Sequence, residues 1–308
     1  MIDVIIPTYK PGEEFVRVIR GLHNQSVKVN RVIIMNTEEA FFEGVANDLH
    51  EYIDEGFIEV HHISKKDFDH GNTRREGIAK SLADIFVMMT MDAVPADDKL
   101  IENLVSPLSD ETVACSYARQ LPKEGDSRRE QITREFNYPD KSVLKSSADY
   151  DRLGIKTFFC SNVCCAYSRR IYDELGGFVS RAIFNEDMIY AGKAVKQGYK
   201  VSYTAEAKVY HSHDYGAIEQ FRRNVDLGIS QADHPEVFDG FKSETEGVRM
   251  VKMVVSRLFR DGKWYEVIPY AWICAWKFMG YRIGKGYKKL PLALVKACST
   301  NPDYLSEV

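Results

Sequence analysis

The chain has 308 residues, of which 44% are hydrophobic, 12% aromatic and 28% charged. These proportions indicate one large or two small globular domains, and exclude a disordered, collagen-like or disulfide-stapled chain. No apolar run reaches the roughly eighteen residues that a membrane-spanning helix requires. The first residues lack the basic segment and cleavage site of a secretory signal. The six cysteines lie in apolar segments without a zinc-binding spacing, so we expect reduced, buried thiols in a cytoplasmic protein.

The net charge of −4 conceals a difference between two parts of the chain. From Arg249 to Lys296 there are eleven basic and two acidic residues, about +9, which leaves about −13 for the rest. A basic segment with interleaved aromatic residues suits anionic lipid, nucleic acid or an acidic partner. Because the body of the chain is acidic, we expect an anionic membrane surface and no nucleic acid as a partner.

Up to residue 95, short apolar runs alternate with segments of helical periodicity. The pattern predicts strands over residues 3–6, 32–35, 57–62 and 85–90 and helices over residues 12–23, 42–52 and 72–83. Such alternation implies βαβ units and a mostly parallel sheet. Ligands bind beyond the carboxyl ends of such strands. Three segments fall at that edge, namely Pro7-Thr8-Tyr9, Asn36-Thr37-Glu38 and Met91-Asp92-Ala93.

The later part of the chain is less regular. Residues 122–157 are polar and irregular, with one helix expected near residues 128–136. An apolar run then predicts a strand over residues 157–167. The pattern then predicts a helix over residues 169–175, a helix capped by Asn185, strands over residues 201–203 and 208–211, and a helix over residues 217–227. After Gly240 the chain becomes helical and amphipathic, so we place a domain boundary near residue 240.

Two motifs in the first half could contact a phosphate group, and each also has a structural explanation. Asp92 ends a strand, where its carboxylate could hold a divalent cation on a diphosphate or could cap a turn. Gly71 opens a helix whose free N–H groups could bind phosphate together with Arg74 and Arg75. The arginines could equally form ion pairs on a solvated face.

Two further motifs lie in the second half. Glu186 and Asp187 could form the acidic first turn of an ordinary helix, or one of them could deprotonate an acceptor hydroxyl. His211 and His213 point to the same side of an extended segment, a spacing that suits metal or phosphate and also occurs in purely structural strands.

In chain order, these motifs resemble the inverting family-two glycosyltransferases, and among them the bacterial rhamnosyltransferases. The resemblance covers nearly the whole chain. The matching segments are residues 4–9, Phe68-Asp69-His70-Gly71 with Thr73-Arg74, Thr90 with Asp92-Ala93 and Pro95, residues 154–157, Ser161-Asn162, residues 174–178, Glu186-Asp187, His211-Ser212-His213 with Tyr215, Phe221-Arg222-Arg223, residues 226–228, Gly280-Tyr281, Gly284-Lys285 and Leu290-Pro291.

The resemblance implies an α/β fold of the GT-A type, with a mostly parallel central sheet flanked by helices and a C-terminal helical extension. It implies inverting transfer of L-rhamnose from dTDP-β-L-rhamnose to a saccharide acceptor carried on a membrane lipid, in the synthesis of a bacterial surface polysaccharide. Asp187 would be the general base and Glu186 the reserve candidate. Donor and sugar contacts would come from Pro7, Thr8, Tyr9, Asn36, Glu38, His70, Arg74, Asn162, Gly177 and Phe178. The metal or diphosphate would be held by Asp92, His211 and His213.

Several positions depart from the family pattern. Asn36 stands where the wider family carries Asp, and Asp92-Ala93-Val94 lacks the second carboxylate of the usual metal motif. Either histidines and diphosphate oxygens complete the shell of a Mg²⁺ or Mn²⁺ ion, or arginines and helix N–H groups stabilise the leaving diphosphate without metal. By the resemblance, residues 1–95 form a nucleotide-binding half, 96–240 an acceptor half, and 241–308 a basic helical region.

The sequence leaves three alternatives to consider. The donor could be a UDP-hexose, or the chain could be a non-catalytic nucleotide-sugar-binding scaffold. A Rossmann dehydrogenase is disfavoured because residues 7–12 lack the Gly-x-Gly-x-x-Gly turn. The C-terminal helices predict peripheral attachment to the inner face of the cell membrane, whereas packing on the catalytic domain or a homodimer contact would explain the same pattern.

Overall fold

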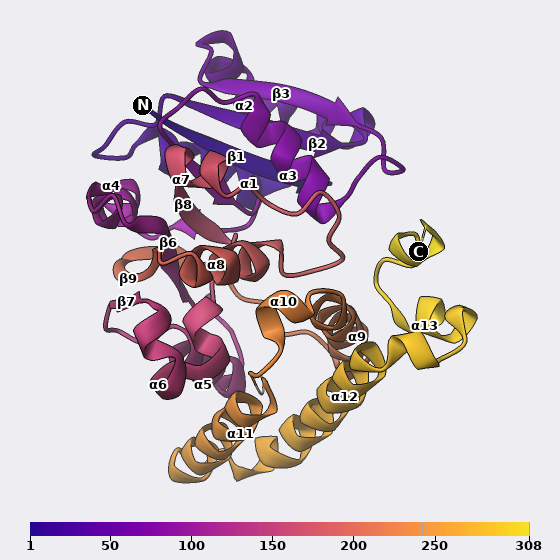
Figure 1. The fold of residues 1–308 in the computed structure, drawn as a ribbon. Helices are drawn as coiled ribbons and strands as arrows, with labels where there is room; N and C mark the ends of the chain where they lie inside the picture. The colour runs from indigo at the N-terminus through magenta and orange to yellow at the C-terminus, as the bar shows by residue number, and fades with distance from the viewer. Residues whose placement is uncertain (242, 308) are drawn as a thin grey trace. The chain divides into compact units, whose positions relative to one another are not determined.

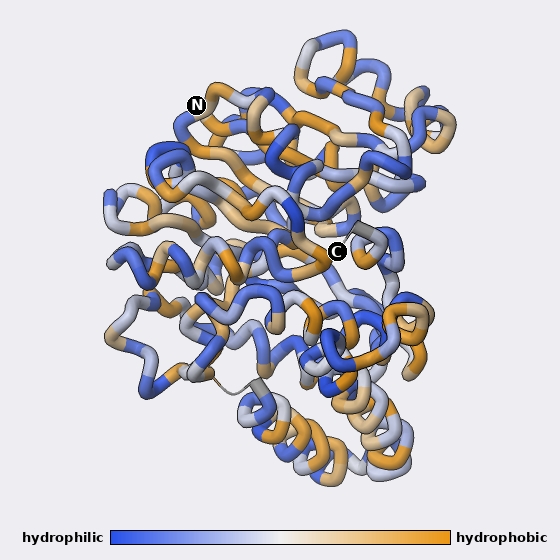
Figure 2. Tube along the Cα trace, turned by 45° about the vertical axis from the view of Figure 1, so that its right-hand side comes forward, coloured by the Kyte–Doolittle hydropathy of each residue, from blue (hydrophilic) through white to orange (hydrophobic). Residues whose placement is uncertain are grey.

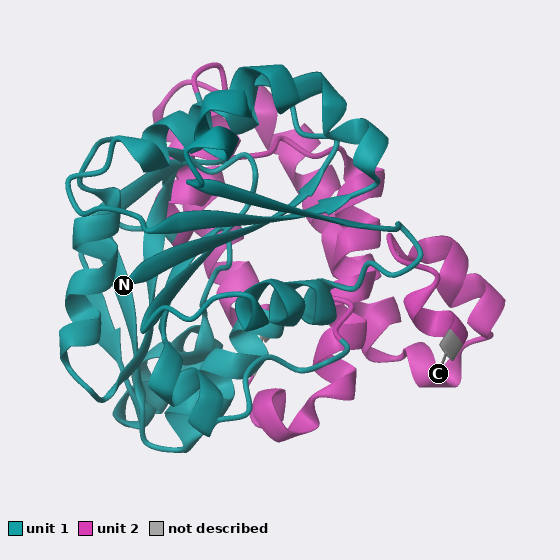
Figure 3. Cartoon of the chain, turned by 90° about the horizontal axis from the view of Figure 1, so that it is seen from above, with its two compact units in different colours: residues 1–123, 138–181, 186–211 teal, residues 124–137, 182–185, 212–308 magenta. Residues whose placement is uncertain are grey.

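The alternating apolar runs and helices build a sheet covered by helices (Figure 1). The structure is a computed structural model that describes residues 1–241 and 243–307; Lys242 and Val308, in the expected C-terminal region, lie outside the described residues. The chain packs as two units (Figure 3). Unit 1 comprises residues 1–123, 138–181 and 186–211, and unit 2 comprises residues 124–137, 182–185 and 212–308. The domain boundary near residue 240 stays a prediction.

Unit 1 contains a nine-stranded sheet in the order β3-β2-β1-β4-β8-β6-β9-β5, with β7 paired to β9. Neighbouring strands from β3 to β4 are parallel, as the βαβ pattern predicts. β8 runs antiparallel to β4 and β6, and β9 is parallel to β6 but antiparallel to β5 and β7. The strands are β1 (Ile2–Tyr9), β2 (Arg31–Thr37), β3 (Ile58–Ile63), β4 (Ile85–Met89), β5 (Val94–Pro95), β6 (Val113–Leu121), β7 (Val143–Lys145), β8 (Cys164–Ser168) and β9 (Lys200–Tyr210).

The helices divide between the two units. Those of unit 1 are α1 (Glu13–His23), α2 (Glu43–Asp54), α3 (His70–Ala79), α4 (Leu100–Val105), α6 (Tyr150–Leu153), α7 (Arg169–Glu174) and α8 (Glu186–Lys196). Those of unit 2 are α5 (Arg128–Asn137), α9 (Ala217–Asp233), α10 (Pro235–Phe238), α11 (Ser243–Arg260), α12 (Val267–Lys285) and α13 (Leu292–Cys298). Each helix expected from the sequence is therefore present, with ends shifted by a few residues.

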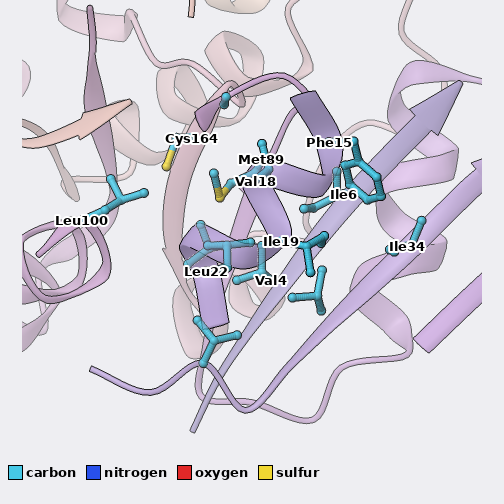
Figure 4. Packing of buried hydrophobic residues seen from close by; sticks show 14 of the residues in the cluster. Val4, Ile6, Phe15, Val18, Ile19, Leu22, Ile34, Met89, Leu100 and Cys164 are labelled. Carbon is cyan, nitrogen blue, oxygen red and sulfur yellow. The ribbon is translucent and has the colours of Figure 1, made fainter. Parts of the chain in front are cut away.

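Side chains of the first strand, β1, pack against helices on both faces of the sheet. Val4 and Ile6 share a buried cluster with the apolar stripe of α1, which includes Phe15 and Ile19 (Figure 4). Ile5 points to the opposite face because side chains alternate along a strand. There, a Cβ at Gly77 of α3 would lie 2.6 Å from Ile5 Cγ2, so glycine lets α3 approach the sheet closely.

The strand expected over residues 157–167 is wrong in its first half. Residues Gly154–Phe158 form a 3₁₀ turn, and only Cys164–Ser168 pair as β8. The buried Lys145 ammonium donates hydrogen bonds to the carbonyl oxygens of Lys156, at 3.2 Å, and Phe159. Because these carbonyl oxygens accept hydrogen bonds from the Lys145 ammonium, the segment forms a turn and does not join the sheet.

The two strands expected over residues 201–203 and 208–211 are one continuous strand, β9. Its pairing with β6 shifts register between Ala118 and Arg119, where Thr204 and Lys208 are the respective partners. This irregularity in the pairing explains why the alternation breaks in the sequence.

Unit 2 is held together by two small apolar clusters. One joins Val225 and Ile229 of α9 to Val295 of α13, and the other joins Ile132 of α5 to Leu258 of α11. None of the helices in the described parts of the chain carries an apolar stretch long enough to cross a bilayer.

Candidate active site

The first turn of α3 is fixed by a capping side chain and by a glycine. Asp69 Oδ1 accepts hydrogen bonds from the N–H groups of Gly71 and Asn72, both at 2.8 Å. A Cβ at Gly71 would lie 2.4 Å from the Val179 carbonyl oxygen, so the close approach requires glycine. The expectation that this helix start offers its N–H groups to phosphate is therefore wrong for these two groups, because the Asp69 side chain already binds them.

Arg74 and Glu186 form a buried ion pair. Arg74 Nε lies 3.2 Å from Glu186 Oε1, and the two side chains are 10% and 7% exposed. Arg74 Nη1 also donates to the His70 carbonyl oxygen at 2.8 Å. The guanidinium predicted to face a diphosphate thus has Glu186 as its partner in this structure.

The pKa of Glu186 follows from this environment. Burial raises it, but the positive charges of Arg74 and His70, together with a hydrogen bond from Asn162 Nδ2 at 3.0 Å, outweigh burial. The pKa of Glu186 therefore lies below its ordinary value, and the carboxylate stays ionised as the partner of Arg74.

Asp187, the next residue, has a different environment. It is half-buried, with Oδ2 accepting from the Asn162 N–H at 2.8 Å and Oδ1 accepting from the Met188 N–H at 2.7 Å. Burial, and then the negative charge of Glu186, raise the pKa of Asp187 well above its ordinary value, although the two N–H groups oppose this. A carboxylate with a raised pKa is a stronger base than an ordinary one, which suits proton abstraction.

Asn162 links the two carboxylates to the sheet. Its amide nitrogen donates to Glu186, its amide oxygen accepts from Tyr167 Oη at 2.7 Å, and its backbone N–H donates to Asp187. The residue is only 4% exposed. The sequence predicts Asn162 as a sugar contact, whereas in the structure its side chain is occupied with holding the carboxylates in place.

The loop after α7 is shaped by packing on aromatic rings. Gly177 has a φ of 70°, and a Cβ there would lie 2.7 Å from the Tyr172 ring. The Phe178 side chain is 1% exposed and packs edge-on against Tyr167 and Tyr172. Arg75 Nη1 donates to the Phe178 carbonyl oxygen at 2.5 Å. The Phe178 ring lies in the core, so only the backbone of this loop is free to face a sugar, and a sugar pocket at the loop stays a prediction.

Asp92 and His211 lie side by side at the end of the sheet. His211 Nε2 is 3.5 Å from Asp92 Oδ2. His211 Nδ1 is 3.1 Å from Gln120 Oε1, and Gln120 Nε2 donates to Tyr138 Oη at 2.6 Å and Ser161 Oγ at 2.9 Å. Since the Gln120 oxygen must accept, His211 Nδ1 carries a proton, and Nε2 is the ring atom that faces Asp92.

Gln120 was not among the predicted site residues. Its signal in the sequence is a polar amide within the apolar strand β6, where it is only 2% exposed. His213, predicted as a further ligand, belongs to unit 2, where its ring stacks on Tyr215 with centroids 4.9 Å apart.

The residues expected near the nucleotide lie at the ends of β1 and β2. Pro7 is in register with Met35. Thr8 Oγ1 donates to Asn36 Oδ1 at 3.0 Å, and Asn36 Nδ2 donates to the Glu38 carbonyl oxygen at 3.0 Å. Asn36 is fully buried and holds the two strand ends together, while its contact with the base or ribose stays a prediction.

An aromatic surface lies at the same edge. Tyr9 is 39% exposed and packs edge-on against Phe41 with ring centroids 5.3 Å apart. Lys10 Nζ lies 4.8 Å from the Phe41 ring centroid. Of these three residues only Tyr9 was predicted; the left-handed φ of Lys10, 54°, which brings its side chain here, is not visible in the sequence.

Comparison with known proteins agrees with this fold. The pattern of glycosyl transferase family 2 matches residues 3–176. The solved structure of the mannosyltransferase PcManGT from Pyrobaculum calidifontis, in complex with GDP-Man and Mn²⁺, superposes with a TM-score of 0.59 at 14% identity, covering 99% of this chain and 84% of that one. This likeness supports the GT-A fold expected from the sequence.

Two relatives are similar over the whole chain. The O-antigen chain rhamnosyltransferase RfbN of Salmonella typhimurium is 37% identical over 311 residues, covering 100% of this chain and 96% of that protein. The O-antigen chain rhamnosyltransferase WbaN of Salmonella anatum is 32% identical, covering 99% of this chain and 96% of that protein. The chain therefore belongs to glycosyl transferase family 2.

Proposed function

We propose that this protein transfers L-rhamnose from dTDP-β-L-rhamnose to a hydroxyl group of a saccharide acceptor in O-antigen synthesis. The observation that carries the proposal is the similarity along the whole chain to two O-antigen chain rhamnosyltransferases. The arrangement around Asp187 supports the same type of reaction, because it offers one half-buried carboxylate of raised pKa.

In this proposal Asp187 is the general base. It takes the proton of the acceptor hydroxyl while the oxygen attacks the anomeric carbon from the face opposite to dTDP, which gives an α-L-rhamnoside with inversion. Glu186 is less suited to this role, since its carboxylate is ionised but paired with Arg74. Asn162 and Met188 keep the Asp187 oxygens in a fixed orientation, so proton transfer needs little reorganisation.

A divalent cation fits the pair of Asp92 and His211. The carboxylate and the imidazole Nε2 face each other, and Gln120 fixes the ring in the tautomer that a metal ion requires. His213 remains the predicted third ligand. When bound, Mg²⁺ or Mn²⁺ would neutralise negative charge on the departing diphosphate. Tyr9, Phe41 and Lys10 present an aromatic, basic surface on which a nucleotide base could stack.

Unit 2 supplies features of a membrane-binding surface. Trp264, Tyr265 and Phe278 are each more than half exposed, on a segment that also carries Lys263 and Lys285. Figure 2 shows hydrophobic and hydrophilic residues interleaved along α11 and α12. Exposed aromatic and basic side chains of this kind bind anionic headgroups. We therefore propose peripheral attachment to the membrane, and expect the protein to float with vesicles containing phosphatidylglycerol but not with pure phosphatidylcholine vesicles.

Donor binding tests the proposed function without an acceptor. The purified protein is titrated calorimetrically with dTDP-rhamnose, UDP-glucose and UDP-galactose, each with Mg²⁺ and with a chelator. We expect selective binding of dTDP-rhamnose that weakens in the chelator. A preference for a UDP-sugar would contradict the assignment of dTDP-rhamnose as the donor. No binding to any of the three nucleotide sugars would favour a non-catalytic role.

A further inference from the structure

A broad hollow lies in unit 2, and its lining contains none of the residues around Asp187. It has a volume of about 990 Å³ and is bounded by the start of α9, the middle of α12 and the segment after α13. Figure 1 shows α9 and α12 running beside one another, with α13 next to them. Its lining residues include Glu219 and Arg222 from α9, Trp272 and Trp276 from α12, and Lys296 and Thr300 from the end of the chain.

The two helices that line the hollow, α9 and α12, also touch closely along their backbones, at glycines outside the lining. A Cβ at Gly284 of α12 would lie 2.1 Å from the Val225 carbonyl oxygen, and one at Gly280 would lie 2.3 Å from the Phe221 carbonyl oxygen. The glycines therefore let the two helix backbones touch. Such an interface has little freedom to move, since no side chains separate the helices.

The wall formed by residues 299–302 is held by a buried acid. Asp226 of α9 is 1% exposed and accepts hydrogen bonds from Ser299 Oγ at 2.6 Å and from the Thr300 N–H at 3.0 Å. These bonds tie the segment after α13 to α9. The hollow is thus bounded by elements with fixed positions, as a preformed binding site requires.

The lining chemistry favours an uncharged, polyhydroxylated ligand. Trp272 is 61% exposed, and its ring lies 5.7 Å from that of Trp276 at an angle of 75°, so the two form an aromatic corner. The flat, weakly polarised C–H face of a sugar ring stacks well on the electron-rich face of an indole. Glu219 and Arg222 nearby offer a hydrogen-bond acceptor and donors for hydroxyl groups.

The charge of the lining argues against a diphosphate or an anionic headgroup. Arg222 and Lys296 are balanced in part by Glu219, and Lys296 Nζ already donates to Ser306 Oγ at 2.8 Å. A polyanion would need more cations than these provide.

We propose that this hollow is a saccharide-binding site, separate in its residues from the Asp187 centre, which holds a neutral segment of the acceptor chain. The inference rests on the proposed function only in taking the acceptor to be a saccharide. Such a site would retain a growing chain while its terminal residue reacts, and so raise the effective concentration of the reacting hydroxyl.

Trp272→Ala in the full-length protein tests the proposal, because the exposed ring can be removed without opening the core. The probe is a neutral rhamnose-containing oligosaccharide, titrated calorimetrically. We expect Trp272→Ala to weaken binding about two- to tenfold, which is the range that loss of one aromatic stacking contact corresponds to. Trp264→Ala, which removes an exposed indole outside the hollow, serves as the control and should bind like the wild type.

The outcomes separate the two proposals. No oligosaccharide binding by the wild type, or equal binding by Trp272→Ala and the wild type, would overturn the saccharide site even if dTDP-rhamnose binds normally. Equal losses in Trp272→Ala and Trp264→Ala would also overturn it. Failure of dTDP-rhamnose to bind, with oligosaccharide binding that depends on Trp272, would contradict the donor assignment and support the site. Arg222→Ala is a second variant and should weaken binding of the same probe.

Discussion

Unit 1 buries its charged groups against one another, whereas unit 2 leaves aromatic and charged side chains around an open hollow. In unit 1, Arg74, Glu186 and Asn162 are less than one tenth exposed, and Glu186 contacts the other two. In unit 2, the close contact is made by glycine backbones, and Trp272 remains mostly exposed. A reaction centre needs groups held in one geometry, while a site for a long acceptor needs accessible surface. The contrast therefore matches a division between chemistry and acceptor binding.

The largest expected effect on stability comes from breaking the buried ion pair. Arg74→Met leaves the Glu186 charge without its partner and should lower the free energy of unfolding by about 3–5 kcal/mol. Urea unfolding followed by circular dichroism measures this. The double variant Arg74→Met/Glu186→Gln removes both charges and should recover part of the loss. If Arg74→Met has the same free energy of unfolding as the wild type, the ion pair does not stabilise unit 1.

A smaller effect is expected at the helix contact of unit 2. Gly284→Ala places a methyl group 2.1 Å from the Val225 carbonyl oxygen, so the helices must separate at a cost of about 1–3 kcal/mol. Gly247→Ala on α11 is the matched control, because a Cβ there meets nothing within 4 Å. It should be neutral or stabilise by up to about 1 kcal/mol. Equal urea midpoints for the two variants would show that the contact between α9 and α12 is loose.

The next test concerns the residue that orients His211. Gln120→Leu removes the acceptor of the Nδ1–H and should weaken Mn²⁺ binding about 10–100-fold, as is usual for such supporting residues. Mn²⁺ affinity is measured in the presence of dTDP. Ser161→Ala removes another Gln120 partner without touching the imidazole and should have a smaller effect. Unchanged affinity in Gln120→Leu would argue against a metal at His211.

The least drastic change is a shift in pH dependence. The Glu186 charge helps burial to raise the pKa of Asp187. A base acts only when ionised, so activity falls as the pH drops through that pKa. Glu186→Gln removes the negative charge and should therefore lower the pKa of Asp187. In the pH–rate profile of dTDP release, the acidic limb should then move to lower pH. Asp151→Asn, an exposed substitution, should leave the limb in place. A shift to higher pH would contradict the assigned coupling.

The sequence predicted elements and motifs better than contacts. Strand and helix periodicity located β1 to β4 and the helices between them. The motifs singled out Asp92 and His211 as a pair, and the two side chains lie side by side in the structure. The bonds of Gln120 and Lys145 could not be predicted, because each depends on pairs of residues far apart in the chain. The buried position of Phe178 was missed for the same reason, since a Gly-Gly-Phe loop looks identical whether its ring points outward or inward.

The central claim is that Asp187 deprotonates the acceptor, and the turnover of Asp187→Asn tests it most directly. Release of dTDP from saturating dTDP-rhamnose is measured for the variant and the wild type with a neutral rhamnose-containing oligosaccharide present as acceptor, and calorimetry confirms that both bind the donor. We predict that turnover falls about 10²–10⁴-fold while donor affinity is unchanged. Near-normal turnover with intact donor binding would contradict the assignment of Asp187 as the base.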